Sequence, residues 1–203
     1  MAPVRTPWTT AILTVLLLTA GIAALTNPHV IGAWGFVPSQ PWRYGGLTCI
    51  TAFFIHAGLV HLLGNLWIFW LTGDNVEDRL GPLRFLLLLG AATLGGDFLH
   101  ALFDPRGDLP CVGASGGISG LMAFYVCAFP RAQIGMAWNF GTVWLRLPAW
   151  SWFMLWIIAQ LWLGLQQTAG FGYVSGLAHL GGAVVGLLAW WRWRSIAPVA
   201  HDG

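Results

Sequence analysis

Four long uncharged runs restrict what this sequence can fold into. They extend over residues 6–42, 44–73, 109–130 and 147–191. Only 8% of the residues are charged, whereas about 25% are charged in a typical soluble domain. A helix that crosses the hydrocarbon core of a bilayer needs about 20 mostly apolar residues, and these runs can supply several such helices. The sequence therefore predicts an all-α, polytopic membrane protein.

We predict six transmembrane helices in a single domain over residues 1–203, because the sequence contains neither a linker nor a fixed-period repeat. The last uncharged run holds two of the helices, separated by the polar segment 166–170. The second and fourth helices are predicted to be short, which leaves room for water above them. The six predicted helices lie near residues 8–25, 59–71, 85–103, 115–129, 149–166 and 176–193.

The arginines predict the orientation, since positive residues accumulate on the cytoplasmic side of a membrane. With the amino terminus inside, seven arginines lie in inner segments and only Arg43 and Arg106 lie outside. We therefore expect cytoplasmic termini. The composition lacks lysine and is rich in arginine, glycine and alanine, so we expect a bacterial inner (plasma) membrane. A cleaved signal peptide after Arg5 is an open alternative, although the first apolar stretch is long for one.

A serine flanked by glycines stands where the fourth predicted helix begins, in Gly113-Ala114-Ser115-Gly116. The first amides of a helix lack intrahelical partners and favour negative charge, and glycine lets the backbone approach a substrate closely. Ser115 is thus a candidate nucleophile whose own N–H stabilises an oxyanion. The alternative is an N-cap serine beside glycines that only permit close helix packing.

His179 lies early in the sixth predicted helix, about one turn before Gly182. Gly182 and Gly186 have the GxxxG spacing of a close-contact face. If that face meets the fourth helix, the imidazole reaches Ser115 and acts as general base and then as general acid. The alternative is a hydrogen-bonded histidine at a helix interface, although an ionisable side chain inside a bundle is a functional candidate.

His61 and Asn65 are four residues apart and share one face of the second predicted helix. Both donate hydrogen bonds without carrying charge, which suits an oxyanion hole. The alternative is hydrogen bonding between helices. His56 precedes this helix, and we interpret it as structural. In the predicted orientation, His61, Ser115 and His179 all lie toward the outer face.

These segments resemble the rhomboid intramembrane serine proteases over most of the chain. The resemblance implies a six-helix rhomboid-like bundle and a serine endopeptidase, a hydrolase with a Ser115–His179 dyad. It also implies an oxyanion hole of His61, Asn65 and the Ser115 amide, single-span membrane proteins as substrates within a lipid bilayer, and no metal or organic cofactor. The matching residues are Trp42-Arg43, His56, His61-x-x-x-Asn65, the segment 73–81, Gly113-x-Ser115-Gly116 and Ala178-His179-x-x-Gly182-x-x-x-Gly186.

Two positions stand out against that pattern. Some rhomboids carry an aromatic residue one turn after the nucleophile, where its ring stacks on the catalytic histidine, but here Ser119 stands at that position. We expect packing on Gly182 or a water bound by Ser119 to orient the imidazole instead. Ser119 is also a weaker candidate nucleophile, since it lies deeper in the helix. Asp97 is an acid in the third predicted helix, and we interpret it as an interfacial residue.

Two other classes of function stay open. A catalytically silent rhomboid relative would bind membrane clients without cutting them, but such relatives commonly lack the serine or the histidine that this sequence has. A small transporter or channel would show a polar path through both leaflets, whereas the polar residues here gather on one side. No basic cluster with interleaved aromatic residues indicates nucleic acid. The sequence does not indicate an oligomeric state.

Overall fold

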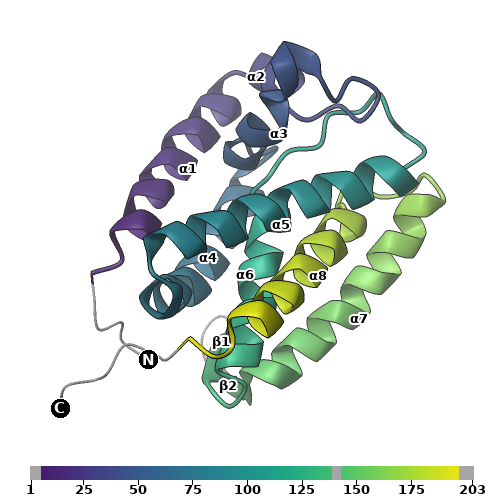
Figure 1. Ribbon diagram of the computed structural model, residues 1–203. Coiled ribbons are helices and arrows are strands. Elements are labelled where there is room, and N and C mark those ends of the chain that lie inside the picture. Colours follow the sequence, from purple (N-terminus) through teal and green to yellow (C-terminus); the bar gives the residue numbers. More distant parts are fainter. Residues whose placement is uncertain (1–5, 139–142, 197–203) are drawn as a thin grey trace.

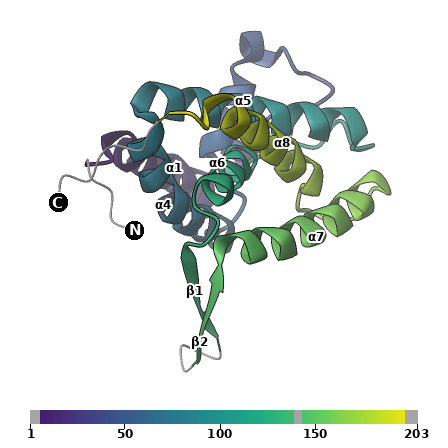
Figure 2. The same cartoon turned by 60° about the horizontal axis from the view of Figure 1, so that its bottom comes forward.

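Six long helices form a bundle in the computed structural model, which describes residues 6–138 and 143–196 (Figure 1). Helix α6 lies at the centre and packs against α4, α5, α7 and α8 (Figure 2). Helix α1 packs against α4 at the edge of the bundle. The six helices are α1 (Trp8–Thr26), α4 (Leu59–Leu80), α5 (Pro82–Phe103), α6 (Ser115–Ala128), α7 (Ala149–Thr168) and α8 (Gly176–Trp193).

Each of these helices coincides with one predicted from the sequence, and five agree with the predicted bounds within a few residues. The signals at their ends are local. Proline at the first position suits the start of α5, where no N–H bond is needed, and Gly81 ends α4 with a positive φ of 75°. Ser175 caps α8 by accepting a hydrogen bond from the Ala178 amide.

Helix α4 is longer than predicted, so the expectation of a short second helix is wrong. It contains 22 residues and continues through Leu80. Its last turns carry a polar side chain that is buried: Glu77 is 7% exposed and accepts hydrogen bonds from the backbone amides of Thr9 and Thr10. A hydropathy profile ends the predicted helix before a charged residue such as Glu77, but here Glu77 is hydrogen-bonded to the start of α1. Helix α6, with 14 residues, is short as predicted.

The number of membrane crossings stays a prediction. Among the described helices, α1 and α5 are each long and apolar enough to cross a membrane. A bent pair, residues Thr48–Phe54 with Leu59–Leu80, would add a third span if it is counted as one. Helix α6 is apolar, but its 14 residues are fewer than the ~20 that a membrane span needs. The structure thus shows a mostly helical membrane-type bundle.

Short elements fill the connection between α1 and α4. They are α2 (His29–Trp34), the 3-10 helix η1 (Arg43–Gly46), α3 (Thr48–Thr51) and the 3-10 helix η2 (Ala52–Phe54). A backbone bridge between Phe36 and Cys111 ties this connection to the segment before α6. The guanidinium of Arg43 donates to the carbonyls of Gly32 and Gly35 and holds the connection folded. This connection therefore borders the segment that leads to Ser115.

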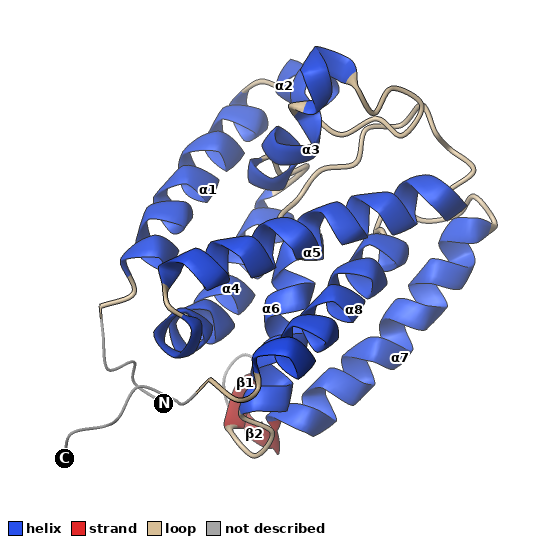
Figure 3. Ribbon diagram, viewed as in Figure 1, coloured by secondary structure: helices blue, strands red, loops and turns tan. Residues whose placement is uncertain are grey.

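Two short strands correct the purely helical prediction (Figure 3). Strand β1 (Gln133–Trp138) pairs antiparallel with β2 (Val143–Pro148), with Gln133 opposite Pro148. The sequence predicts only that Arg131 and Arg146 lie in an inner segment here. Leu145, Arg146 and Leu147 alternate with the period of a strand, a signal that a search for long uncharged runs passes over.

The main apolar core holds α4, α5 and α6 together. Phe69, Phe85 and Phe124 come from these three helices and are fully buried. The ring centroids of Phe69 and Phe85 are 6.2 Å apart, within the range of favourable aromatic pairs. This packing fixes α4 against α6, the two helices that carry the predicted oxyanion donors and the predicted nucleophile.

Glycines bring α8 against α6. A Cβ on Gly182 would collide with the carbonyl oxygen of Gly116, and a Cβ on Gly186 would collide with that of Gly120. The predicted GxxxG face is therefore a contact face, and its neighbour is α6. Because Gly182 follows His179 by about one turn and Gly116 directly follows Ser115, this contact brings the two ends that carry these residues together.

Candidate active site

A cavity of about 990 Å³ opens among the helices, and all four predicted site residues line it. Ser115 comes from α6, His179 from α8, and His61 and Asn65 from α4. The structure thus brings together residues that are up to 118 positions apart (179 − 61). His61, Ser115 and His179 are each half-buried, and Asn65 is 8% exposed.

Ser115 is the first residue of α6, and no side chain caps that helix. The N-cap position belongs to Ala114, so the alternative that Ser115 is the N-cap is wrong. Gly113 has a φ of 125°, which disfavours a residue with a side chain. A Cβ on Gly113 would also lie 2.7 Å from the His61 ring and 3.7 Å from Ser115 Oγ. Glycine is therefore required for His61 and Ser115 to share this space.

His179 is held by α7. Its Nδ1 lies 2.6 Å from Oε1 of Gln160, and its ring centroid is 6.0 Å from that of Trp156, with the planes 33° apart. The hydrogen bonds of the described residues do not include one between Ser115 and His179. Catalytic hydrogen bonds are often long without substrate and tighten when it binds, so a shared cavity is compatible with a dyad.

Ser119 does not take part in orienting His179 through any described bond. Its side chain is buried, and its hydroxyl donates to the carbonyl of Ser115 at 2.5 Å. A role for Gly182 packing or for a water bound by Ser119 stays a prediction, and the structure places Trp156 and Gln160 against the imidazole. The only sequence signal for Gln160 was a polar residue within an apolar helix.

His61 and Asn65 lie on one face of α4, as their spacing predicts. Asn65 Nδ2 donates to the backbone carbonyl of His61 at 2.8 Å. The His61 ring meets the His56 ring edge-on, with centroids 5.0 Å apart. His56 is fully buried and does not line the cavity, which agrees with its interpretation as structural. His56 thus packs against the His61 ring and helps to hold it in place.

Asp97 lies in the wall of the same cavity. Its Oδ2 is buried and has no hydrogen-bond partner among the described residues. The interpretation of Asp97 as an interfacial residue stays a prediction. The Asp97 side chain is half-buried overall, so its carboxyl group is a polar element of the cavity wall.

A network of polar side chains, which we call the Asp104 latch, joins Asp104, Arg106 and Gln167 beside the cavity. Arg106 donates through Nε and Nη2 to the Asp104 carboxylate, at 3.0 and 2.8 Å, and Gln167 Nε2 donates at 2.8 Å. Burial favours a raised pKa for Asp104, but these hydrogen bonds outweigh it and hold the pKa below its ordinary value.

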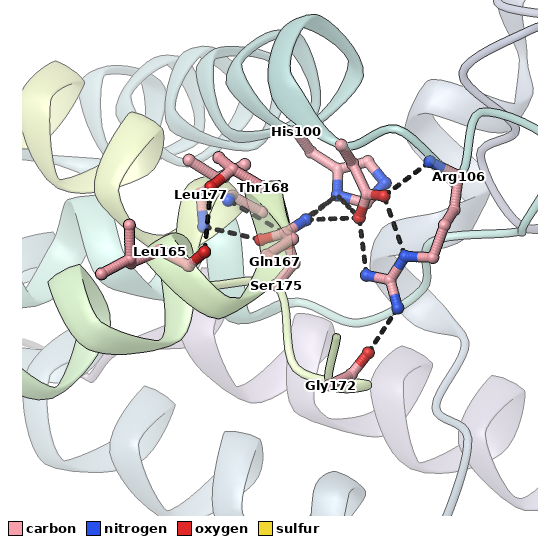
Figure 4. Close-up of polar contacts among 10 residues, drawn as sticks. His100, Arg106, Leu165, Gln167, Thr168, Gly172, Ser175 and Leu177 are labelled. Carbon is pink, nitrogen blue, oxygen red and sulfur yellow. Dashed lines mark hydrogen bonds and ion pairs between the residues drawn. The ribbon is translucent and has the colours of Figure 1, made fainter. Parts of the chain in front are cut away.

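The Asp104 latch connects three parts of the fold (Figure 4). Arg106 also donates to the carbonyl of Gly172, in the loop that precedes α8, and Gln167 Oε1 accepts from the Leu177 amide. The latch therefore fixes the end of α7 and the start of α8, the helix that carries His179. No sequence pattern predicts the Asp104 latch, because Gln167 is distant in the sequence from Asp104 and Arg106.

Comparison with known proteins identifies the family of this chain. Residues 38–195 match the Rhomboid domain family, and the chain belongs to the rhomboid family. The predicted family resemblance is thereby confirmed.

Three relatives illustrate the extent of the similarity. Rhomboid-related protein 1 of Caenorhabditis elegans is 31% identical over 177 residues, which cover 83% of this chain and 45% of that protein. The putative rhomboid protease YdcA of Bacillus subtilis is 38% identical over 92 residues, covering 45% and 43%. Rhomboid protease GluP of the same bacterium is 32% identical over 103 residues, covering 48% and 19%. The chain thus spans less than half the length of these relatives.

Proposed function

We propose that this protein is an intramembrane serine endopeptidase that cleaves the transmembrane segments of single-span membrane proteins. The observation that carries the proposal is the shared cavity, in which Ser115, His179, His61 and Asn65 meet from three helices. The names of the two bacterial relatives, which include the word protease, support it. In this proposal all six long helices span a bacterial inner membrane, and both termini are cytoplasmic.

The proposed reaction is acyl transfer to a serine. Ser115 Oγ attacks the scissile carbonyl while His179 accepts the hydroxyl proton, and His179 then gives that proton to the leaving amine. The oxyanion accepts hydrogen bonds from the Ser115 amide, His61 and Asn65. Water from the cavity then hydrolyses the acyl-enzyme, with His179 again acting as the base. No side chain caps the first turn of α6, and this supports the role of the Ser115 amide as a donor to the oxyanion.

The test is cleavage of a single-span reporter by the protein in liposomes. Ser115→Ala is expected to abolish cleavage without changing thermal unfolding. Ser119→Ala is the matched control, because Ser119 lies one turn further along α6 and its hydroxyl is occupied by the Ser115 carbonyl. Cleavage that persists in Ser115→Ala, or that is lost only in Ser119→Ala, contradicts the assignment of the nucleophile.

The alternative function is a catalytically silent rhomboid-like protein that binds membrane clients. The observation behind this alternative is that the described residues show no hydrogen bond between Ser115 and His179. A serine-directed fluorophosphonate separates the two functions, since it reacts only with an activated serine. Labelling that is present in the wild type and absent in His179→Ala supports the protease. A wild type that is not labelled but still binds single-span proteins supports the silent relative.

A further inference from the structure

We propose that Gln160 of α7 is a positioning residue that holds the imidazole of His179 in the tautomer required of a general base. The inference rests on the proposed protease function. It begins from one contact, in which Gln160 Oε1 lies 2.6 Å from His179 Nδ1. Gln160 is 5% exposed, so water does not compete freely for its amide.

The chemistry of this contact fixes where the imidazole proton lies. An amide oxygen only accepts hydrogen bonds, so Nδ1 must carry the proton and donate it to Gln160. A neutral imidazole has one ring proton, which leaves Nε2 as an unprotonated acceptor. That is the state in which a histidine takes the proton of a serine hydroxyl.

A neutral amide suits this place better than a carboxylate. In water-accessible serine proteases a buried aspartate binds the Nδ1 proton and sets the tautomer. Inside a membrane bundle an additional buried charge is costly. Among the described residues, no carboxylate is hydrogen-bonded to His179, and Gln160 supplies the acceptor without a charge.

Helix α7 restrains the ring in a second way. Trp156 precedes Gln160 by one turn, and its ring centroid lies 6.0 Å from that of His179. Ser119 does not replace this contact, because its hydroxyl donates to the Ser115 carbonyl. One contact face of α7 therefore sets both the orientation of the imidazole plane and the nitrogen that carries the proton. The contact of Gly182 with α6 sets the position of His179 along the axis of α6.

The competing explanation is that Gln160 only joins α7 to α8. Three variants distinguish the two explanations. Gln160→Met fills the space but has no strong acceptor, Gln160→Asn withdraws the acceptor while staying polar, and Gln160→Glu keeps an oxygen in place. Gln166→Met is the matched control, since Gln166 lies on the same helix and has no hydrogen bond to His179 among the described contacts.

The first measurement does not depend on activity. Nitrogen-15 NMR of the histidine side chains, with His179 assigned by its loss in His179→Asn, reports which ring nitrogen carries the proton. We expect protonated Nδ1 in the wild type, Gln160→Glu and Gln166→Met, and a shift toward protonated Nε2 in Gln160→Met and Gln160→Asn. An unchanged tautomer in both of the last two variants overturns the proposal.

The second measurement is kinetic, with thermal unfolding recorded for every variant. We expect kcat in Gln160→Met and Gln160→Asn to fall by about 10-fold to 100-fold at unchanged KM, less than the ~10⁴-fold loss on disturbing a charged triad. Gln160→Glu should retain more activity than Gln160→Met and Gln160→Asn, because it keeps an acceptor oxygen near Nδ1. A loss that follows the unfolding temperature, with no rescue by Gln160→Glu, leaves Gln160 structural and overturns the proposal.

The two hypotheses fail in different ways. If the wild type cleaves and is labelled but Gln160→Met behaves as Gln166→Met does, only the positioning role is refuted. If the wild type neither cleaves nor reacts with the fluorophosphonate, the protease function is refuted, and the role of Gln160 in catalysis is refuted with it.

Discussion

The carbonyl oxygen of Gly116 on α6 occupies the space into which a Cβ on Gly182 of α8 would project. At this point the backbones of the two helices touch, with no side chain between them. Small residues permit such contacts between helices in membranes. Since Ser115 precedes Gly116 and His179 lies about one turn before Gly182, the same contact sets the separation of the proposed nucleophile and its base.

We therefore expect Gly182→Ala to destabilise the bundle and to reduce proteolysis more than stability alone explains. Overpacking of a close contact costs about 1–3 kcal/mol, and here the added methyl group meets backbone that has no rotamer to change. Thermal unfolding in detergent and reporter cleavage measure the two effects. Gly90→Ala is the control, because a Cβ on Gly90 of α5 meets nothing within 4 Å. Equal stability of the two variants contradicts this account of the α6–α8 contact.

The helices were predictable because their signals are local and repeated. Long uncharged runs, a proline at the start of α5 and a serine cap on α8 each depend on neighbouring residues only. The position of the four candidate residues on one cavity was also predictable, since each stands near the polar start of an apolar segment, whereas their catalytic roles stay predictions. The extension of α4 was not predictable, because Glu77 is buried through its hydrogen bonds to α1, and hydropathy does not register such bonds.

The surroundings of His179 could not be predicted for a similar reason. Nothing in the spacing of Trp156 and Gln160 indicates which face of α7 meets α8. The Asp104 latch likewise joins residues 63 positions apart, Asp104 and Gln167. Pattern analysis identifies chemical groups within one helix, whereas the partner of each group depends on how the helices pack.

Glu77 is expected to hold α1 against α4. Its carboxylate accepts from the amides of Thr9 and Thr10 and from the Thr10 hydroxyl, at 2.9, 2.8 and 2.7 Å, where a helix has unpaired N–H groups and favours negative charge. Glu77→Ala should cost about 1.5–3 kcal/mol, as hydrogen bonds to charged groups do, and should speed amide hydrogen exchange in α1. Thr19→Ala, which removes only a bond within α1, is expected to change neither.

The Asp104 latch should make stability depend on acidity. A carboxyl group whose pKa is lowered by folding stabilises the fold fully above its ordinary pKa of about 4, and the stabilisation is lost as the pH falls through the folded pKa. Asp104→Asn should therefore unfold at a lower temperature than the wild type at pH 7, and this difference should narrow below about pH 4. Arg106→Gln should reproduce the effect. A difference that is constant from pH 7 to pH 3 contradicts the role of the latch.

The face of α4 that lines the cavity should contribute to catalysis through Asn65. In the described state its side chain donates to the His61 carbonyl, so its second amide proton is free to meet an oxyanion. Loss of one such donor typically costs about 100-fold to 1,000-fold in kcat, and Asn65→Ala should do so with little change in KM. Asn75→Ala is the matched control, since Asn75 lies on the same helix but outside the cavity and bonds to Asp74.

Because His61 and Asn65 would act on the same oxygen, the double variant His61→Ala/Asn65→Ala should lose less activity than the product of the two single losses. Equal rates in Asn65→Ala and Asn75→Ala would remove Asn65 from the oxyanion hole and leave the Ser115 amide and His61 as its donors.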